Sequence, residues 1–444
     1  MIPLITSGIS AENHMKQLFP KQAEALKFFE TCHDLNINTL DTSHVGTGKT
    51  VVAAHLASSL CRPVAVICPK AVIPSWEREL EENGIDPIFV LNYEKLRTGR
   101  TPHVKKRGKK IFAWQLPPDT LMLFDECHKA KGPYTQNAQL LIAAAQAGYP
   151  IHMMSATAAE DPTEMRAIGF ALGLHSLNAA KGDLKSWYSW MRCNGCYQNQ
   201  WKAWELRKRS ALKDLHDTMY QKSVKRLTVS DFPDSFKNNR IFVEPIQFSN
   251  LSKINKAYAE LGITPEIVTQ FIEEGTVEDS EFVLVNMLRA RQLAESFKVH
   301  DLVEMANDLR DEGNSVVLFV NFRETADALA EALKCGKIEG GQDAALRQQY
   351  IDEFQEDDAD VLIVNIAAGG TGISLHDVRG ERPRVSLISP SFNVKDHLQA
   401  LGRIHRNGAK SDALQKVLVA SGTVEEAVLK AIDRKSSNLD MLHG

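Results

Sequence analysis

The chain has 444 residues, of which 43% are hydrophobic and 24% are charged, and this length exceeds a single hydrophobic core and predicts two or three globular domains. Its formal net charge of −4 excludes a uniformly basic surface, so any polyanion must be bound by local basic patches. The first ten residues lack the pattern of a signal peptide and no apolar run is long enough to span a bilayer, so we expect a cytoplasmic protein with no membrane attachment.

The first predicted element is a helix over residues 23–29, whose apolar positions are spaced for packing on a core. Gln22 precedes it and has two interpretations. It is either a surface residue of the helix or, because an amide offers one donor and one acceptor, a group that reads the edge of an adenine.

Residues 43–50 read SHVGTGKT and lie between a short apolar run, predicted as a buried strand, and a predicted helix from residue 51. Glycines in such a turn let consecutive N–H groups point at a polyphosphate, and the start of the helix adds its positive dipole end. Lys49 is expected to reach the terminal phosphate oxygens and Thr50 to ligate Mg²⁺. The predicted nucleotide site comprises Gly46, Thr47, Gly48, Lys49 and Thr50.

Two acids follow the apolar strand predicted over residues 121–124. By themselves Asp125 and Glu126 are typical of a solvated turn. Together with the phosphate loop, at the carboxyl end of a buried parallel strand, they indicate a ligand site. Asp125 would then hold Mg²⁺ with Thr50, and Glu126 would orient and deprotonate the attacking water.

A further strand is predicted over residues 151–154 and ends in Ser155 and Thr157. These short hydroxyl residues are expected to contact His128 and relay the state of the nucleotide. Strands and helices alternate throughout this half, which predicts a parallel, doubly wound sheet.

Two basic segments follow different patterns. Residues 97–110 are too charged for a core and are either a solvated hairpin or loop or a contact for a phosphate backbone. Residues 181–226 carry eleven Lys and Arg against four Asp and Glu, with tryptophans and tyrosines interleaved. This pattern is typical of a small helical insertion with a basic face, and it also favours contact with nucleic acid.

Seven scattered cysteines favour reduced thiols over a disulfide framework. Cys193 and Cys196 have the spacing of half a zinc site, but a tetrahedral site would need distant partners such as His175 or His216. Free thiols are the preferred interpretation.

The second half repeats the architecture with apolar strands near residues 315–320, 361–364, 385–388 and 417–419, but it has no second GKT loop. It has instead a glycine-rich turn over 367–372. Arg403 and Arg406 are placed by their spacing on one face of a predicted helix. Such residues are commonly solvated, but here they predict arginine fingers that reach a γ-phosphate held by the first domain.

In this order the motifs resemble the superfamily-two helicases and translocases, most closely their Swi/Snf-like branch. The resemblance rests on Gln22, SHVGTGKT, ICPKAVIPSW, residues 92–94, DECH, SAT, residues 317–322, the turn at 339–341 with Arg347 and Phe354, AAGGTGISL, and QALGRIHRNG. The chain departs from the branch after Arg406, where it reads NGA instead of the usual IGQ, so the remodelling activity of large eukaryotic members is not implied. Its compact form is more similar to phage or bacterial helicases of the DEAH/DECH-box type.

The resemblance implies an α/β protein with two tandem RecA-like parallel-sheet domains, at residues 1–175 and 240–444, and a helical basic insertion at 176–239. It implies ATP and Mg²⁺ as cofactors, with Gly372 at the nucleotide. The residues that it implies for nucleic-acid binding or for coupling to the nucleotide are Lys70, Tyr93, His128, Ser155, Thr157, Gly370, Thr371 and Gln399.

We therefore expect a monomeric, ATP-dependent DNA helicase or translocase that acts on forked, branched or duplex DNA, with RNA as the weaker alternative. Two other interpretations remain: a double-strand translocase that never separates strands, and a nucleic-acid binding module that ATP only gates.

Overall fold

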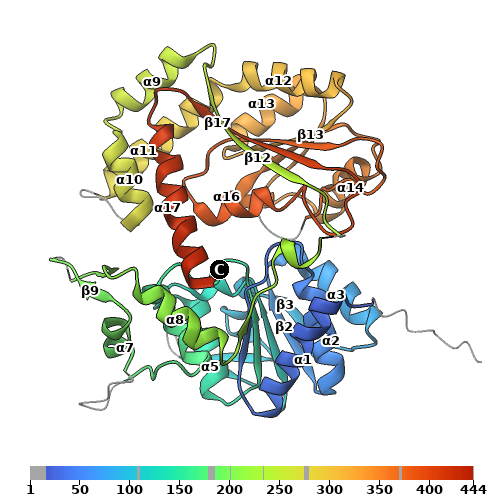
Figure 1. Ribbon diagram of the computed structural model, residues 1–444, viewed down its shortest axis with the longest axis vertical. Coiled ribbons are helices and arrows are strands. Elements are labelled where there is room, and N and C mark those ends of the chain that lie inside the picture. The colour runs from blue at the N-terminus through green and yellow to red at the C-terminus, as the bar shows by residue number, and fades with distance from the viewer. Residues whose placement is uncertain are drawn as a thin grey trace, which may run out of the picture.

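The computed structural model describes residues 17–107, 111–178, 186–200, 202–233, 235–274, 280–369 and 373–443. They form two lobes, stacked one above the other in Figure 1, each built on a six-stranded sheet. All strand pairs within the two large sheets are parallel. The predicted tandem arrangement of parallel-sheet α/β domains is confirmed.

The first lobe has the strand order β11-β1-β8-β7-β2-β3. Four of its strands are buried along their whole apolar length because both faces are covered by helices, as parallel sheets require. The strands are β1 (Thr39–Asp41), β2 (Val64–Cys68), β3 (Phe89–Asn92), β7 (Leu121–Asp125), β8 (Ile151–Met154) and β11 (Val224–Lys225). The helices are α1 (Pro20–Asp34), α2 (Lys49–Leu60), α3 (Ile73–Glu82), α4 (Tyr93–Leu96), α5 (Gln136–Gln146) and α6 (Arg166–Ala171).

The second lobe has the strand order β12-β17-β16-β13-β15-β14. Its strands are β12 (Asn239–Ile246), β13 (Ser315–Val320), β14 (Gly336–Ile338), β15 (Val361–Asn365), β16 (Arg384–Ile388) and β17 (Ala413–Ala420). Its helices are α9 (Leu251–Glu260), α10 (Pro265–Glu274), α11 (Ser280–Ser296), α12 (Val299–Asp311), α13 (Arg323–Leu333), α14 (Ala344–Gln355), α15 (Ile366–Gly369), α16 (Val394–Leu401) and α17 (Glu425–His443). The predicted glycine-rich turn begins as α15, and Gly370, Thr371 and Gly372 lie outside the described residues.

The insertion differs from the prediction in extent and content. It contains α7 (Trp187–Cys193) and α8 (Ala211–Tyr220), but also an antiparallel hairpin of β9 (Cys196–Gln198) and β10 (Trp204–Leu206). It ends in β11, which pairs with β1 as the edge strand of the first sheet. The chain therefore returns to the sheet of the first lobe after the insertion, before it crosses to the second lobe.

The described part of the basic segment, residues 97–107, contributes two strands to a small antiparallel sheet, and residues 108–110 lie outside the described residues. The strands of this sheet are β4 (Arg100–Thr101), β5 (Val104–Arg107) and β6 (Ile111–Trp114). Lys106 is held in this sheet, since its ammonium donates to Gln136 Oε1 at 3.0 Å and lies over the ring of Phe112. Of the CxxC pair, Cys193 is exposed and Cys196 is buried. The described residues contain no cluster of three or more His, Cys, Asp or Glu suited to a metal.

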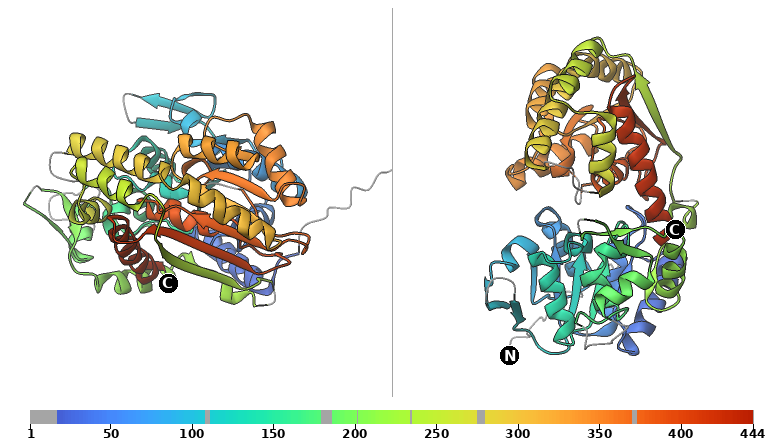
Figure 2. Two further views of the ribbon diagram at one scale, coloured as in Figure 1. Left: turned by 90° about the horizontal axis from the view of Figure 1, so that it is seen from above. Right: turned by 90° about the vertical axis from the view of Figure 1, so that its left-hand side faces the viewer.

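Helix α17 belongs to the second lobe but ends on the first, as Figure 1 and the right view of Figure 2 show. Leu442, near its end, is buried in the main core of the first lobe. His443 Nε2 donates to the carbonyl of Ala159 at 2.9 Å, and the carbonyl of His443 accepts from the Tyr220 hydroxyl at 3.0 Å. Among the described helices, none has the length and apolar character of a membrane span.

Candidate active site

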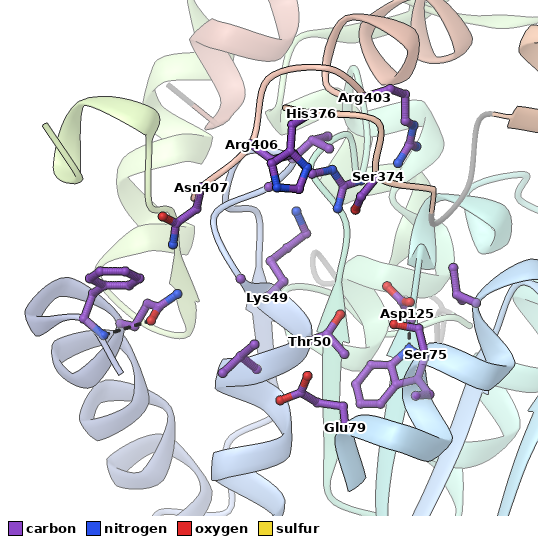
Figure 3. Close-up of a pocket in the computed structure, with 18 of the residues that line it drawn as sticks. Lys49, Thr50, Ser75, Glu79, Asp125, Ser374, His376, Arg403, Arg406 and Asn407 are labelled. Carbon is purple, nitrogen blue, oxygen red and sulfur yellow. Dashed lines mark hydrogen bonds between the residues drawn. The ribbon is translucent and has the colours of Figure 1, made fainter. Parts of the chain in front are cut away.

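A cavity of about 570 Å³ lies between the lobes. The first lobe contributes residues from the 43–50 loop, from α3 and from the end of β7, and the second lobe contributes residues from 374–376 and 403–407. Figure 3 shows Lys49 and Thr50 below and Arg403 and Arg406 above, on opposite walls. The structure thus brings together the predicted phosphate loop, acid pair and arginines.

The 43–50 loop is shaped by its glycines and by the strand before it. Gly46 and Gly48 have φ values of 86° and 91°, in the left-handed region that a residue with a side chain rarely adopts. The backbone N–H of Ser43 donates to Asp41 Oδ1 at 2.8 Å, which turns the chain as it leaves β1. Helix α2 then begins at Lys49, so its N–H groups point toward the cavity.

Lys49 is half-buried within this loop. Its Nζ donates to the carbonyls of Ser43 at 2.7 Å and His44 at 3.0 Å. Burial lowers the pKa of Lys49, whereas the nearby carboxylates of Asp41 and Glu126 act in the opposite direction. The ammonium is therefore poised beside the cavity and held by two weak acceptors that a phosphate could replace.

Gln22 is 3% exposed, so the surface interpretation is wrong. Its Nε2 donates to the carbonyl of Thr47 at 2.8 Å and its Oε1 accepts from the N–H of Phe19 at 3.0 Å. A Cβ at Gly48 would lie 2.4 Å from the same Nε2. The amide therefore packs against the loop and lines the cavity, and each of its two polar atoms retains a further hydrogen-bonding position.

The carboxylate of Asp125 is held from both sides. Trp76 Nε1 donates to Oδ2 at 2.9 Å and the backbone N–H of Glu126 donates to Oδ1 at 2.8 Å. Burial, with the negative charge of Glu126, raises the pKa of Asp125 to about 6. Trp76 was not predicted as a site residue, because nothing in the spacing of α3 shows that its indole faces a carboxylate on another strand.

Glu126 belongs to a polar network with His128 and Ser155. Its Oε2 lies 3.0 Å from His128 Nδ1 and 3.3 Å from Ser155 Oγ, and the same Oγ lies 3.0 Å from His128 Nδ1. Thr157 joins through its N–H, which donates to Ser155 Oγ at 3.2 Å. Burial acts to raise the pKa of Glu126, but the hydrogen bond and charge of His128, with Lys49, lower it to about 2. Glu126 is therefore a carboxylate at neutral pH, in the contact predicted between the SAT and DECH strings.

The two arginines reach the cavity by a different route from the one predicted. Helix α16 ends at Leu401, so Arg403 and Arg406 lie in the turns that follow and not on a helical face. Arg403 Nη1 and Arg406 Nη2 both donate to the carbonyl of Ile373, at 3.3 Å and 2.9 Å. A shared acceptor, not helical spacing, makes them converge.

The loops of the two lobes are in direct contact here. A Cβ at Gly46 would lie 3.3 Å from Arg406 Cγ, and one at Gly402 would lie 2.8 Å from Val45 Cβ. Burial lowers the pKa of Arg406 to about 10, and burial with the charge of Arg406 lowers that of Arg403 to about 9. Both guanidinium groups therefore stay positive at neutral pH, facing Glu126.

The remaining predicted residues are dispersed. Lys70 is exposed at the end of β2, whereas Gln399 is buried in α16. Tyr93 is fully buried and donates from its hydroxyl to the carbonyl of Asp125 at 2.9 Å. Direct contact between Tyr93 and a nucleic acid is excluded by this burial, so only the coupling role predicted for it is compatible with its position.

The oxygen ligands at the cavity suit a small, hard cation. Mg²⁺ is typically bound by one or two carboxylates together with substrate phosphates and water. The Asp125 carboxylate and the Thr50 hydroxyl line the same cavity, and the loop beside them supplies the backbone N–H groups and ammonium that a polyphosphate requires. The residues present therefore fit a magnesium-bound nucleoside triphosphate.

Comparison with known proteins gives consistent matches. The family described as the helicase conserved C-terminal domain matches residues 297–408. A protein of Acanthamoeba polyphaga mimivirus, provisionally named ATP-dependent RNA helicase L364, is 30% identical over all of this chain and 87% of its own length. The SNF2 domain-containing protein ENL1 of Oryza sativa is 22% identical over 93% of this chain and half of its own length. The DNA repair and recombination protein RAD54-like of Drosophila ananassae is 30% identical over 39% of this chain and 23% of its own length.

Proposed function

The chain belongs to the superfamily-two helicases, in their Swi/Snf-like branch, and from this we propose that it hydrolyses ATP between its two lobes to move along or remodel forked, branched or duplex DNA. Members of this family are nucleic-acid-dependent ATPases. The observation that carries the proposal is that cationic groups of both lobes and the acid pair of the first lobe line one cavity.

The first lobe binds the nucleotide in this proposal. The N–H groups of residues 46–50 and the ammonium of Lys49 bind the phosphates, and Lys49 exchanges its two carbonyl acceptors for phosphate oxygens. We propose that Gln22, whose amide packs against the loop, pairs with the adenine through the further hydrogen-bonding positions of its amide. Thr50 and Asp125 would hold Mg²⁺, which when bound neutralises charge on the terminal phosphates.

Glu126 acts on the attacking water. It is ionised, and His128 and Ser155 fix the position of its carboxylate. A positioned base of this kind contributes about 10²- to 10⁴-fold in rate. Ser155 and Thr157 connect this network to the chain beyond β8, which gives a path by which nucleic acid and nucleotide affect each other.

The second lobe completes the site. Arg403 and Arg406 stabilise the charge that develops on the transferred phosphoryl group, a role that contributes about 10³- to 10⁵-fold. Because these groups belong to the other lobe, hydrolysis depends on how the lobes are placed. Each cycle of ATP binding and product release therefore changes the contacts that the two lobes make with a nucleic-acid strand. One chain holds both halves of the site, so a monomer suffices.

We propose DNA as the strand and RNA as the second candidate, because the names of the relatives support both but DNA more often. The RAD54-like relative is named a DNA repair and recombination protein, and this name supports DNA as the proposed strand. The mimivirus relative is named as an RNA helicase, and this makes RNA the second candidate. We expect the two lobes to contact the phosphate backbone of the strand and not the edges of its bases, so the base sequence should have little effect on binding.

The test is ATP hydrolysis by the full chain with single-stranded DNA, duplex, forks, four-way junctions and RNA. We expect DNA to stimulate hydrolysis more than RNA, and Lys49→Ala and Glu126→Gln to abolish the stimulated rate. Glu126→Gln should still bind ATP, since only the base is lost. Stimulation that survives in both variants would contradict the proposed site.

Two assays separate the remaining alternatives. Displacement of a triplex-forming strand without unwinding of a fork would favour a double-strand translocase. ATP-dependent binding without directional movement in either assay would favour a module that ATP only gates.

A further inference from the structure

A second cavity, of about 500 Å³, lies on the first lobe away from the nucleotide site. One wall is the loop at 131–134, which follows the DECH string, together with the short turn Pro162–Glu164, which follows the SAT string. The other wall is formed by α7, β9 and β10 of the insertion. Neither the predicted site residues nor the proposed ATPase mechanism uses this groove.

Aromatic rings dominate its surface. Tyr188 and Trp204 are stacked, with ring centroids 5.7 Å apart and an angle of 26° between the planes. The hydroxyl of Tyr188 lies 2.7 Å from that of Tyr134 across the groove. Tyr134 is 51% exposed and Tyr188 is 48% exposed, even though their positions are held by these contacts. Large rings that are both fixed and open to solvent are ready to bind at little further cost in entropy.

The charge around these rings favours an anionic ligand. The guanidinium of Arg166 lies 4.9 Å from the centroid of Tyr134, and that of Arg192 lies 5.6 Å from the centroid of Trp204. Lys202 also lines the groove. Among the described residues that line the groove the one acid is Glu164, which pairs with Lys131, and Glu160 outside the lining pairs with the same ammonium. The groove therefore combines π surfaces with an excess of cations, which is the combination that single-stranded nucleic acids bind.

The first wall connects the groove to the catalytic network. The N–H of Lys131 donates to the carbonyl of His128 at 3.1 Å, and His128 contacts both Glu126 and Ser155. A ligand that contacts the 131–134 loop would therefore affect the position of His128, which in turn positions the proposed general base, Glu126.

We propose that this groove holds an unpaired base of a nucleic-acid strand, stacked on Tyr188, with the strand's phosphates near Arg192 and Lys202. The inference rests on the proposed function, because it assumes that a nucleic acid is the ligand. It adds a specificity: bases of an intact duplex are stacked on one another, so only a single-stranded tail, gap or fork arm can occupy the groove.

The experiment measures binding of fluorescein-labelled oligodeoxythymidylate by anisotropy, beside an otherwise equal oligonucleotide that carries abasic sites. Tyr188→Ala should weaken binding of the intact oligonucleotide by about 5- to 100-fold and should remove its advantage over the abasic one. Tyr188→Phe keeps the ring and should retain most of the affinity. Lys202→Gln should reduce the dependence of log K on log salt by about 1, whereas Tyr188→Ala should leave it unchanged.

Phe282→Ala is the matched control. Phe282 is an aromatic residue of the second lobe that is 72% exposed, and its removal should change neither affinity nor discrimination. Circular dichroism shows whether each variant is folded, and ATP hydrolysis without nucleic acid should be unchanged in all of them. The same measurement with oligouridylate in place of oligodeoxythymidylate shows whether the groove prefers an unpaired base of RNA or of DNA.

Two results would overturn the proposal. One is a folded Tyr188→Ala protein that binds both oligonucleotides as the wild type does, while DNA still stimulates hydrolysis; this leaves the proposed function standing. The other is a wild-type protein that binds no oligonucleotide and is stimulated by none, which removes the proposed function as well.

Discussion

The two lobes share one architecture but contribute to the site in different ways. In the first lobe, the functional residues follow directly after buried strands: the 43–50 loop after β1, the acid pair after β7 and the hydroxyl pair after β8. In the second lobe, the arginines follow a helix, and the carbonyl of Ile373 brings them together. The first lobe thus builds its site from strand ends, and the second from a loop whose shape depends on a distant backbone group.

This difference predicts how each lobe responds to change. The first lobe should bind nucleotide by itself, because phosphate loop and metal ligands lie within it. Changes to the arginines of the second lobe should reduce the rate of hydrolysis and leave nucleotide binding unchanged, because these arginines reach the cavity from the opposite side of the interface between the lobes.

The largest effect is expected from Arg406→Ala. Loss of the guanidinium should reduce kcat by about 10³- to 10⁵-fold with little change in the affinity for ATP. Nucleotide binding measured beside steady-state hydrolysis checks this, and Lys49→Ala is the comparison, since it should weaken both. If Arg406→Ala left turnover intact, the second lobe would not complete the site.

A smaller effect is expected when a side chain is added between the 43–50 loop of the first lobe and the arginine loop of the second. A Cβ at Gly402 would lie 2.8 Å from Val45 Cβ, so Gly402→Ala must push the arginine loop away. A misplacement of about 1 Å can cost about 10²-fold in rate. Val45→Ala in the same chain should restore part of kcat by giving back that space. A Gly402→Ala enzyme with full activity would show that the contact is not kept during turnover.

Within the first lobe, Trp76→Phe removes the indole donor to Asp125 Oδ2 but keeps an aromatic ring. Loss of a group that orients a metal ligand typically costs about 10- to 100-fold in metal affinity, so the concentration of Mg²⁺ for half-maximal hydrolysis should rise by that factor. Tyr93→Phe is the control, because the Tyr93 hydroxyl contacts the Asp125 carbonyl and not the carboxylate. Equal effects of both changes would argue against a specific role for Trp76.

The smallest effect is expected where α17 meets the first lobe. Tyr220→Phe removes the hydroxyl that donates to the carbonyl of His443 and contacts Thr42, next to the phosphate loop. The free energy of unfolding should fall by about 1 kcal/mol, and amide exchange at the end of α17 should rise. Unchanged exchange there would mean that burial of Leu442, and not this hydrogen bond, holds the helix in place.

Much of the first lobe follows from local pattern. Gly46, Gly48, Lys49 and Thr50 act through the backbone of one turn and the start of one helix, and both features are properties of adjacent residues. The same holds for Asp125 and Glu126 at the end of an apolar strand. The position of Gln22 against Thr47 required the packing of α1 on the loop, so its two interpretations stayed open until the structure was known.

The order of motifs along the chain determined the parallel-sheet architecture, the pairing of a phosphate loop with an acid pair, and the family. Tertiary structure alone decided that β11 returns to the first sheet, that Trp76 faces Asp125, and that the arginines converge outside a helix. The physical reason is range. Helix periods, turns and strand ends depend on neighbours a few residues away, whereas a shared carbonyl or a second lobe brings together groups that the sequence separates by tens or hundreds of residues.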